Sequence, residues 1–114
     1  MPGVADCRMP ELVALLKQLS EGLGDVEPAR AHGCAGVGAR GKAYALVASG
    51  ERIAVRLPDW DLFTLAFELP GSEPLSAEGG RVGHWVVLPE AVRDDGEALG
   101  EWVRRAHELT AVDV

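Results

Sequence analysis

Leucine and valine recur every three or four positions between residues 10 and 23, which is the spacing of one face of an α-helix. Pro10 suits the first helical turn, where its missing N–H costs no hydrogen bond. Gly22 and Gly24 follow, and glycine supplies the left-handed conformation with which many helices end. The pattern predicts an amphipathic helix over residues 10–23.

Two short apolar segments follow the Gly-rich stretch 33–41, and Ser49-Gly50 separates them. Residues 42–48 form a nearly continuous apolar run, whereas large apolar side chains occupy every second position of residues 52–57. Alternation of this kind is typical of a strand with one buried face. We therefore expect two antiparallel strands, with the second face of their sheet open or covered by a partner.

A second helix is predicted between Pro58-Asp59 and Pro70-Gly71, because aromatic and aliphatic residues cluster there at helical spacing. Asp59 is suited to cap its first turn. Residues 73–76 and 82–88 are typical of two further strands.

A last helix is expected to begin at Asp94 or Asp95, either of which is a suitable cap. Its apolar positions include Leu99, Trp102 and Leu109, and its acids precede its basic residues, as the helix dipole favours.

The connections between most neighbouring strands are too short for parallel crossovers, so the sheet should be antiparallel. At 114 residues the chain has the length of one domain. We predict one α+β domain over residues 1–114, with two layers: an antiparallel sheet, and helices packed on one face of it.

The segment Gly36-Val-Gly38-Ala-Arg-Gly41-Lys42 satisfies the dinucleotide pattern GxGxxG and nearly satisfies the P-loop pattern. However, Ala43 stands where a P-loop needs a hydroxyl, and a strand is predicted after Lys42 where both motifs need a helix. We assign these glycines to a turn or bulge, or to close approach of backbones, and we expect no nucleotide and no other cofactor.

Eighteen acidic and eleven basic side chains give a net charge of -7, which repels nucleic acid and anionic membranes. Residues 31–57 nevertheless hold four basic side chains and one acidic. Solvated surface charge accounts for this surplus, but an anionic partner could also use it. The candidate contact residues there are Arg40, Lys42, Arg52 and Arg56.

Neither a catalytic centre nor a metal site is indicated. His32 and Cys34 are two positions apart, so an extended chain places them on one side, but no third orienting group is recognisable, and an inert buried thiol is the commoner case. The remaining histidines and cysteine lack the close pairing typical of zinc sites. Paired aspartates such as Asp59 and Asp61 adjoin predicted helix starts, where acids are expected anyway. We expect no enzyme activity.

The three tryptophans fall one per predicted element, at Trp60, Trp85 and Trp102, on faces that we expect to turn inward. Trp60 lies between two aspartates and is the candidate for a partner contact if it is exposed.

The longest apolar runs are far shorter than the roughly 20 residues that span a bilayer. The N-terminus lacks the features of a signal peptide, and two cysteines in an unexported chain are usually reduced thiols. The sequence therefore predicts a cytoplasmic protein without a membrane segment.

Parts of the chain from about Ala31 to Leu109, some two-thirds of it, resemble the TfoX N-terminal domain family. The resemblance lies in Gly41-Lys42-Ala-Tyr-Ala-Leu-Val-Ala48, Gly71-Ser-Glu-Pro-Leu75 and Glu101-Trp102-Val-Arg-Arg105. His84-Trp85-Val86 is also similar to the YjbR/MmcQ group, which ranks second.

The TfoX resemblance implies a two-layer fold with the element order α-β-β-β-α-β-β-α. It also implies a non-enzymatic regulatory or protein-interaction module whose partner is another protein or a second copy of the chain. The alternative, a YjbR/MmcQ-like protein, would bind nucleic acid through the basic hairpin region.

Overall fold

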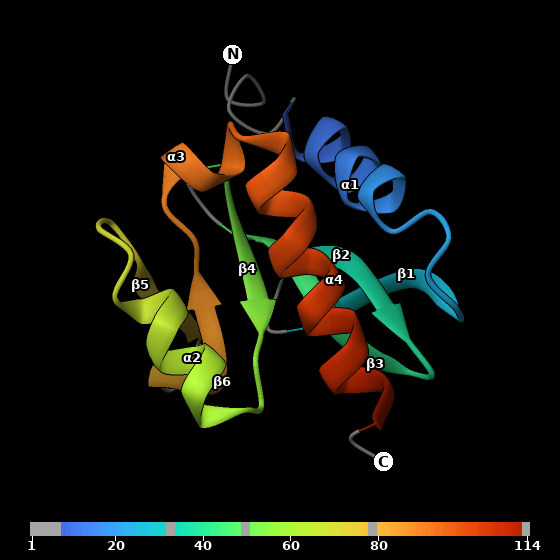
Figure 1. Ribbon diagram of the computed structural model, residues 1–114. Helices are drawn as coiled ribbons and strands as arrows, with labels where there is room; N and C mark the ends of the chain where they lie inside the picture. Colours follow the sequence, from blue (N-terminus) through green and yellow to red (C-terminus); the bar gives the residue numbers. More distant parts are fainter. Residues whose placement is uncertain (1–7, 32–33, 49–50, 78–79, 113–114) are drawn as a thin grey trace.

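The computed structural model describes residues 8–31, 34–48, 51–77 and 80–112 (Figure 1). The helices are α1 (Arg8–Leu19), α2 (Trp60–Phe67), α3 (Glu90–Arg93) and α4 (Gly96–Val112). The strands are β1 (Val26–Ala31), β2 (Cys34–Ala39), β3 (Lys42–Ala48), β4 (Arg52–Arg56), β5 (Glu73–Ala77) and β6 (Gly80–Val87).

All six strands belong to one antiparallel sheet in the order β1-β2-β3-β4-β6-β5. The α+β class and the antiparallel sheet are therefore confirmed. The structure adds β1 and the short helix α3 to the order that the family resemblance implies. Helix α1 ends at Leu19, before the predicted limit of residue 23.

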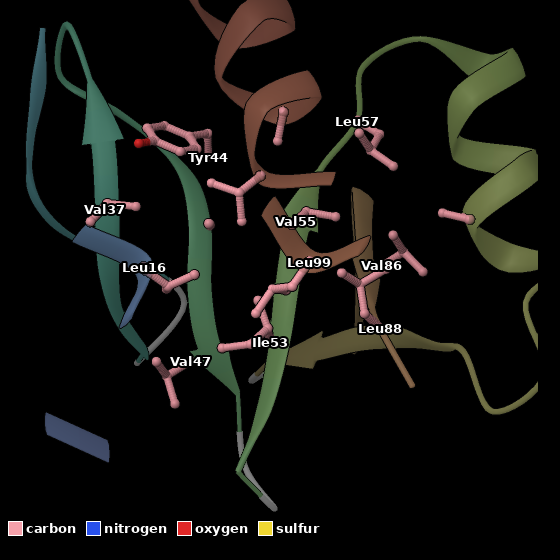
Figure 2. Close-up of a cluster of buried hydrophobic side chains, with 14 of the residues drawn as sticks. Leu16, Val37, Tyr44, Val47, Ile53, Val55, Leu57, Val86, Leu88 and Leu99 are labelled. Atoms are coloured by element: carbon pink, nitrogen blue, oxygen red, sulfur yellow. The ribbon is translucent and has the colours of Figure 1, made fainter. Parts of the chain in front are cut away.

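The helices lie on one face of this sheet, as predicted. Helices α1 and α4 cross its β2–β4 part, and α2 lies over β6 on the other side of α4 (Figure 1). Side chains of these helices meet the sheet in one core; its largest buried members include Leu16, Leu57, Leu88 and Leu99 (Figure 2).

The opposite face of the sheet carries a second apolar cluster that is buried within the single chain. This contradicts the expectation that the face is open or covered by a partner. Leu46, Ala54 and Trp85 point away from the helices and are at most 4% exposed. The alternation in β4 misses this because Ala54 is small, although it is as buried as its neighbours Ile53 and Val55.

Strands β2 and β3 pack closely because glycines of β2 lie against the backbone of β3. A Cβ at Gly36 would lie 2.0 Å from the carbonyl oxygen of Ala45, and one at Gly38 would lie 2.5 Å from that of Lys42. Arg40 and Gly41 form the following two-residue turn, with φ of 53° and 83°, as type I′ hairpins require. The prediction of close backbone approach and a turn is confirmed, and the glycines precede the strand β3.

A β-bulge shifts the register between β2 and β3. Val37 pairs with Ala45 and Gly38 with Ala43, so Tyr44 is the extra residue. Tyr44 consequently joins Ala45 in the helix-facing core, and the bulge directs its ring towards α4.

Both edge strands contain proline, at Pro28 in β1 and Pro74 in β5. Proline has no N–H to offer an incoming strand, so these edges are poor templates for strand addition.

Candidate functional site

Helix α2 is built from local signals that the sequence contains. The Asp59 carboxylate accepts hydrogen bonds from the backbone N–H groups of Asp61 at 2.9 Å and Leu62 at 3.2 Å, so the predicted cap is confirmed. At the other end, the Ser72 hydroxyl donates to the carbonyl of Ala66 at 2.7 Å. The helix is thus fixed at both ends.

Helix α2 has more apolar side chains than it buries. Of the residues in α2, only Ala66 is fully buried, while Trp60 is 65% and Leu65 55% exposed. These two are the large hydrophobic side chains that lie exposed in the part of the chain with described side chains. The expectation that Trp60 turns inward is therefore wrong, whereas Trp85 is buried and Trp102 packs against the core.

The exposed side chains of α2 are those of Trp60, Asp61, Thr64, Leu65 and Glu68, the last being its C-cap residue; we call this set the α2 surface. At 3.6 residues per turn these five positions form one continuous face. Trp60 and Leu65 border that face, and Asp61, Thr64 and Glu68 lie between them.

Aromatic rings hold Trp60 in place. Its ring centroid lies 5.5 Å from that of Phe63, edge to face, and 5.2 Å from that of His84. Phe63 in turn contacts Phe67 at 5.2 Å and is partly buried against the core. Such ring pairs stabilise an aromatic side chain in a defined orientation although most of its surface is accessible.

His84 is the member of this cluster that sequence reasoning missed. It lies where β6 changes pairing, with a φ of +66°, and its carbonyl accepts a hydrogen bond from the Leu57 N–H at 2.7 Å. Its Nδ1 is buried with no hydrogen-bond partner among the described residues. Positive φ at a non-glycine residue is uncommon, and Gly83 beside His84 is the signal of a bend that the sequence offers.

The basic candidates do not form one site. Arg40 lies in the β2–β3 turn, Lys42 follows this turn, and Arg56 ends β4 at the same end of the sheet. Arg52, however, pairs with Ala48 at the opposite end. Arg56 places Nη1 3.5 Å from the Thr110 hydroxyl of α4.

Acidic groups accompany the basic hairpin. Asp25 forms an ion pair with Arg40 at 3.2 Å, and the Glu27 carboxylate accepts from the Gly41 N–H at 2.7 Å. The local positive surplus seen in residues 31–57 is therefore reduced in space by carboxylates that precede it in the chain.

Arg52 performs a structural task. Its guanidinium donates to the carbonyls of Leu88 at 3.0 Å and Gly71 at 2.6 Å, and forms an ion pair with Glu73 at 2.7 Å. The side chain is 16% exposed, so little of it is left for a partner.

In the described part of the chain, the other side chains that could serve in catalysis or metal binding do not lie together in one site. Cys34 is half-buried, and His32, its proposed neighbour, lies outside the described residues. Within the described part of the chain no three His, Cys, Asp or Glu side chains are grouped so as to hold a metal ion. A shallow hollow at the start of α4 is lined by Asp95, Glu97, Ala98 and Glu101.

Comparison of the chain with protein-family models and with curated proteins gives no match. Over the described residues, none of the helices has the length and apolar character needed to cross a membrane.

Proposed function

We propose that this chain is a non-enzymatic protein-interaction module and that the α2 surface is its docking site. The observation that carries the proposal is Trp60, which is 65% exposed yet held by the rings of Phe63 and His84. Tryptophan is enriched among residues that dominate binding energy, because it offers a large rigid area at small entropic cost.

A regulatory role within the TfoX N-terminal family is part of the same proposal. An antiparallel sheet with helices on one face supports it, since that is the fold the resemblance implies. The additional strand β1 has no counterpart in the implied order. We also propose a cytoplasmic location; two cysteines in 114 residues are far fewer than the dense disulfide frameworks of many small secreted domains contain, which supports it.

Nucleic-acid binding is the weaker alternative. It would need Arg40, Lys42, Arg52 and Arg56 to act together, but Arg52 lies at the other end of the sheet and is engaged by two carbonyls. Arg40 is also paired with Asp25.

Site-specific photo-crosslinking in cells of the source organism tests the docking site. A photoreactive phenylalanine analogue would replace Trp60 or Leu65 in turn, with Glu97 on α4, which is also exposed, as the matched control position. We expect both α2 positions to yield the same protein adduct and position 97 to yield none. Absence of an α2 adduct, or equal labelling from position 97, would refute the docking site.

A further inference from the structure

We infer that the partner of the α2 surface is a cationic and apolar protein segment, one that presents Lys or Arg side chains between two apolar side chains. This inference rests on the proposed docking site and specifies the chemistry that would occupy it.

The first argument is charge. Asp61 and Glu68 are exposed, and neither has an ion-pair partner among the residues that the structure describes. Some of the other exposed carboxylates are paired; Asp25 binds Arg40, and Glu108 binds Arg104 at 3.0 Å. The α2 surface therefore has negative charge that no ion pair with a described residue compensates.

The chain also supplies no cation nearby along its length. Between Arg56 and Arg81 the sequence has five acidic residues and no Lys or Arg. Arg56, the basic residue that precedes α2, directs Nη1 to Thr110 on α4. Because none of the described residues forms an ion pair with Asp61 or Glu68, we assign this role to a cation of the partner.

The second argument is the arrangement of the surface. Because Asp61 and Glu68 lie between Trp60 and Leu65 on the helix, an approaching segment meets apolar contact on both sides of a negative strip. The Trp60 ring can also accept a Lys or Arg side chain through a cation–π contact. A purely polar cation would leave the large hydrophobic area of Trp60 and Leu65 in water.

The same arrangement disfavours other occupants. A second copy that docks α2 against α2 through a two-fold axis would bring like carboxylates together, which opposes association. Nucleic acid and anionic membranes carry the same sign of charge as this surface.

Nuclear magnetic resonance with model peptides tests the inference on the full chain. The probe is a helical peptide of Leu and Lys; one matched peptide has Glu in place of Lys, and another has Ser in place of Leu. The chain has three tryptophans, so Trp60→Phe identifies the indole N–H signal of Trp60. We expect only the Leu/Lys peptide to shift that signal and the α2 amides.

Two double variants separate local charge from net charge. Asp61→Asn with Glu68→Gln should weaken binding of the Leu/Lys peptide roughly three- to tenfold, as loss of two exposed ion pairs implies. Glu21→Gln with Glu97→Gln removes the same charge from exposed positions outside the α2 surface and should change the affinity less than twofold. Circular dichroism confirms that each variant is folded.

Several results would overturn the inference. These are absence of binding, preference for the Glu peptide, equal weakening in both double variants, or shifts confined to the acidic hollow at the start of α4. The photo-crosslinking result is independent: an α2 adduct with an acidic partner or a second copy would retain the docking site and refute the cationic partner.

Discussion

The hydroxyl groups of Ser20 and Tyr44 share a hydrogen bond of 2.6 Å, and both side chains are at most 1% exposed. Ser20 follows α1, and the β-bulge of β3 directs Tyr44 into the helix-facing core. His107 of α4 meets the Tyr44 ring edge to face at 5.2 Å and places Nε2 2.6 Å from the Gly24 carbonyl oxygen. A carbonyl only accepts hydrogen bonds, so Nε2 carries the proton.

Removing the hydroxyl group of Ser20 or Tyr44 should leave the other one buried without this hydrogen bond. We expect Tyr44→Phe to lower the free energy of unfolding by about 1–2 kcal/mol, because the buried Ser20 hydroxyl loses its partner. Adding Ser20→Ala should then cost little more, so the double variant loses less than the sum of the two single variants. Urea denaturation of all four proteins measures this coupling, and strict additivity would show that the hydrogen bond contributes nothing of its own.

Tyr44 should also make the protein sensitive to alkali. Burial raises the pKa of Tyr44 above its ordinary value of 10.0, and the hydrogen bond with Ser20 opposes this in part. In the unfolded chain the phenol ionises first, so its contribution to stability is complete below about pH 10 and is lost as the pH rises further.

Tyr44 is the only tyrosine, so the near-ultraviolet absorbance of tyrosinate reports this group alone. We expect its titration in the native state to lie above that in urea. Stability measured above about pH 10 should fall more steeply for the wild type than for Tyr44→Phe. Parallel stability curves for the two proteins would contradict the raised pKa.

Elements with a strong hydrophobic period were predictable from the sequence. The strands at residues 42–48 and 52–57 and the helix capped by Asp59 have nearly the predicted limits. In each case the local pattern and the tertiary environment favour the same structure.

Strand β1 was not predictable in this way. Its sequence Val26-Glu-Pro-Ala-Arg-Ala31 has few large apolar residues, and all of its side chains are exposed or half-buried because it is an edge strand. Strand β2 could not be recognised because it contains glycines, which allow the backbone of β3 to approach closely. Both strands are specified by pairing with distant residues rather than by local preference.

The candidate site likewise combines residues that the sequence indicates with residues whose role depends on tertiary packing. Trp60 could be singled out because it lies between Asp59 and Asp61 next to a predicted cap, but its exposure depends on how α2 packs. The sequence does not indicate His84 as a site residue, because its contact with the Trp60 ring depends on the irregular pairing of β6. Sequence alone also could not separate Arg52 from Arg40, which differ in their partners rather than in their local pattern.

Gly36→Ala should severely destabilise the protein. The added methyl group would meet the Ala45 carbonyl oxygen at 2.0 Å and the Leu46 Cα at 2.7 Å, and both are backbone atoms that cannot turn aside. We expect a loss of about 3 kcal/mol or more in the free energy of unfolding, or failure to fold. Gly96→Ala is the matched control, since nothing lies within 4 Å of its added Cβ.

Thermal denaturation distinguishes these two glycine variants. The Gly96→Ala protein should unfold at or slightly above the wild-type temperature, because alanine favours the helix. A Gly36→Ala protein of equal stability would mean that β2 and β3 are not packed as described.

Asp95 caps α4, which settles the choice between the two aspartates before this helix. Its carboxylate accepts from the N–H groups of Glu97 and Ala98, each at 3.2 Å. Asp95→Ala should cost about 1 kcal/mol, whereas Asp95→Asn retains a capping oxygen and should cost much less. Urea denaturation checks the order, and equal losses in the two variants would assign the effect to charge rather than to capping.

Arg52→Lys tests whether this side chain is structural, as its three contacts with the chain indicate. A lysine cannot reproduce the forked donors that reach the carbonyls of Leu88 and Gly71 and the carboxylate of Glu73, so we expect a loss of about 1–3 kcal/mol. Arg40→Lys is the matched control; its ion pair with Asp25 is mostly exposed, and the change should stay within about 0.5 kcal/mol. Equal and small effects at both positions in urea denaturation would return Arg52 to the set of residues available to an anionic partner. A large effect at Arg52 alone removes it from that set and leaves the α2 surface as the better-supported contact.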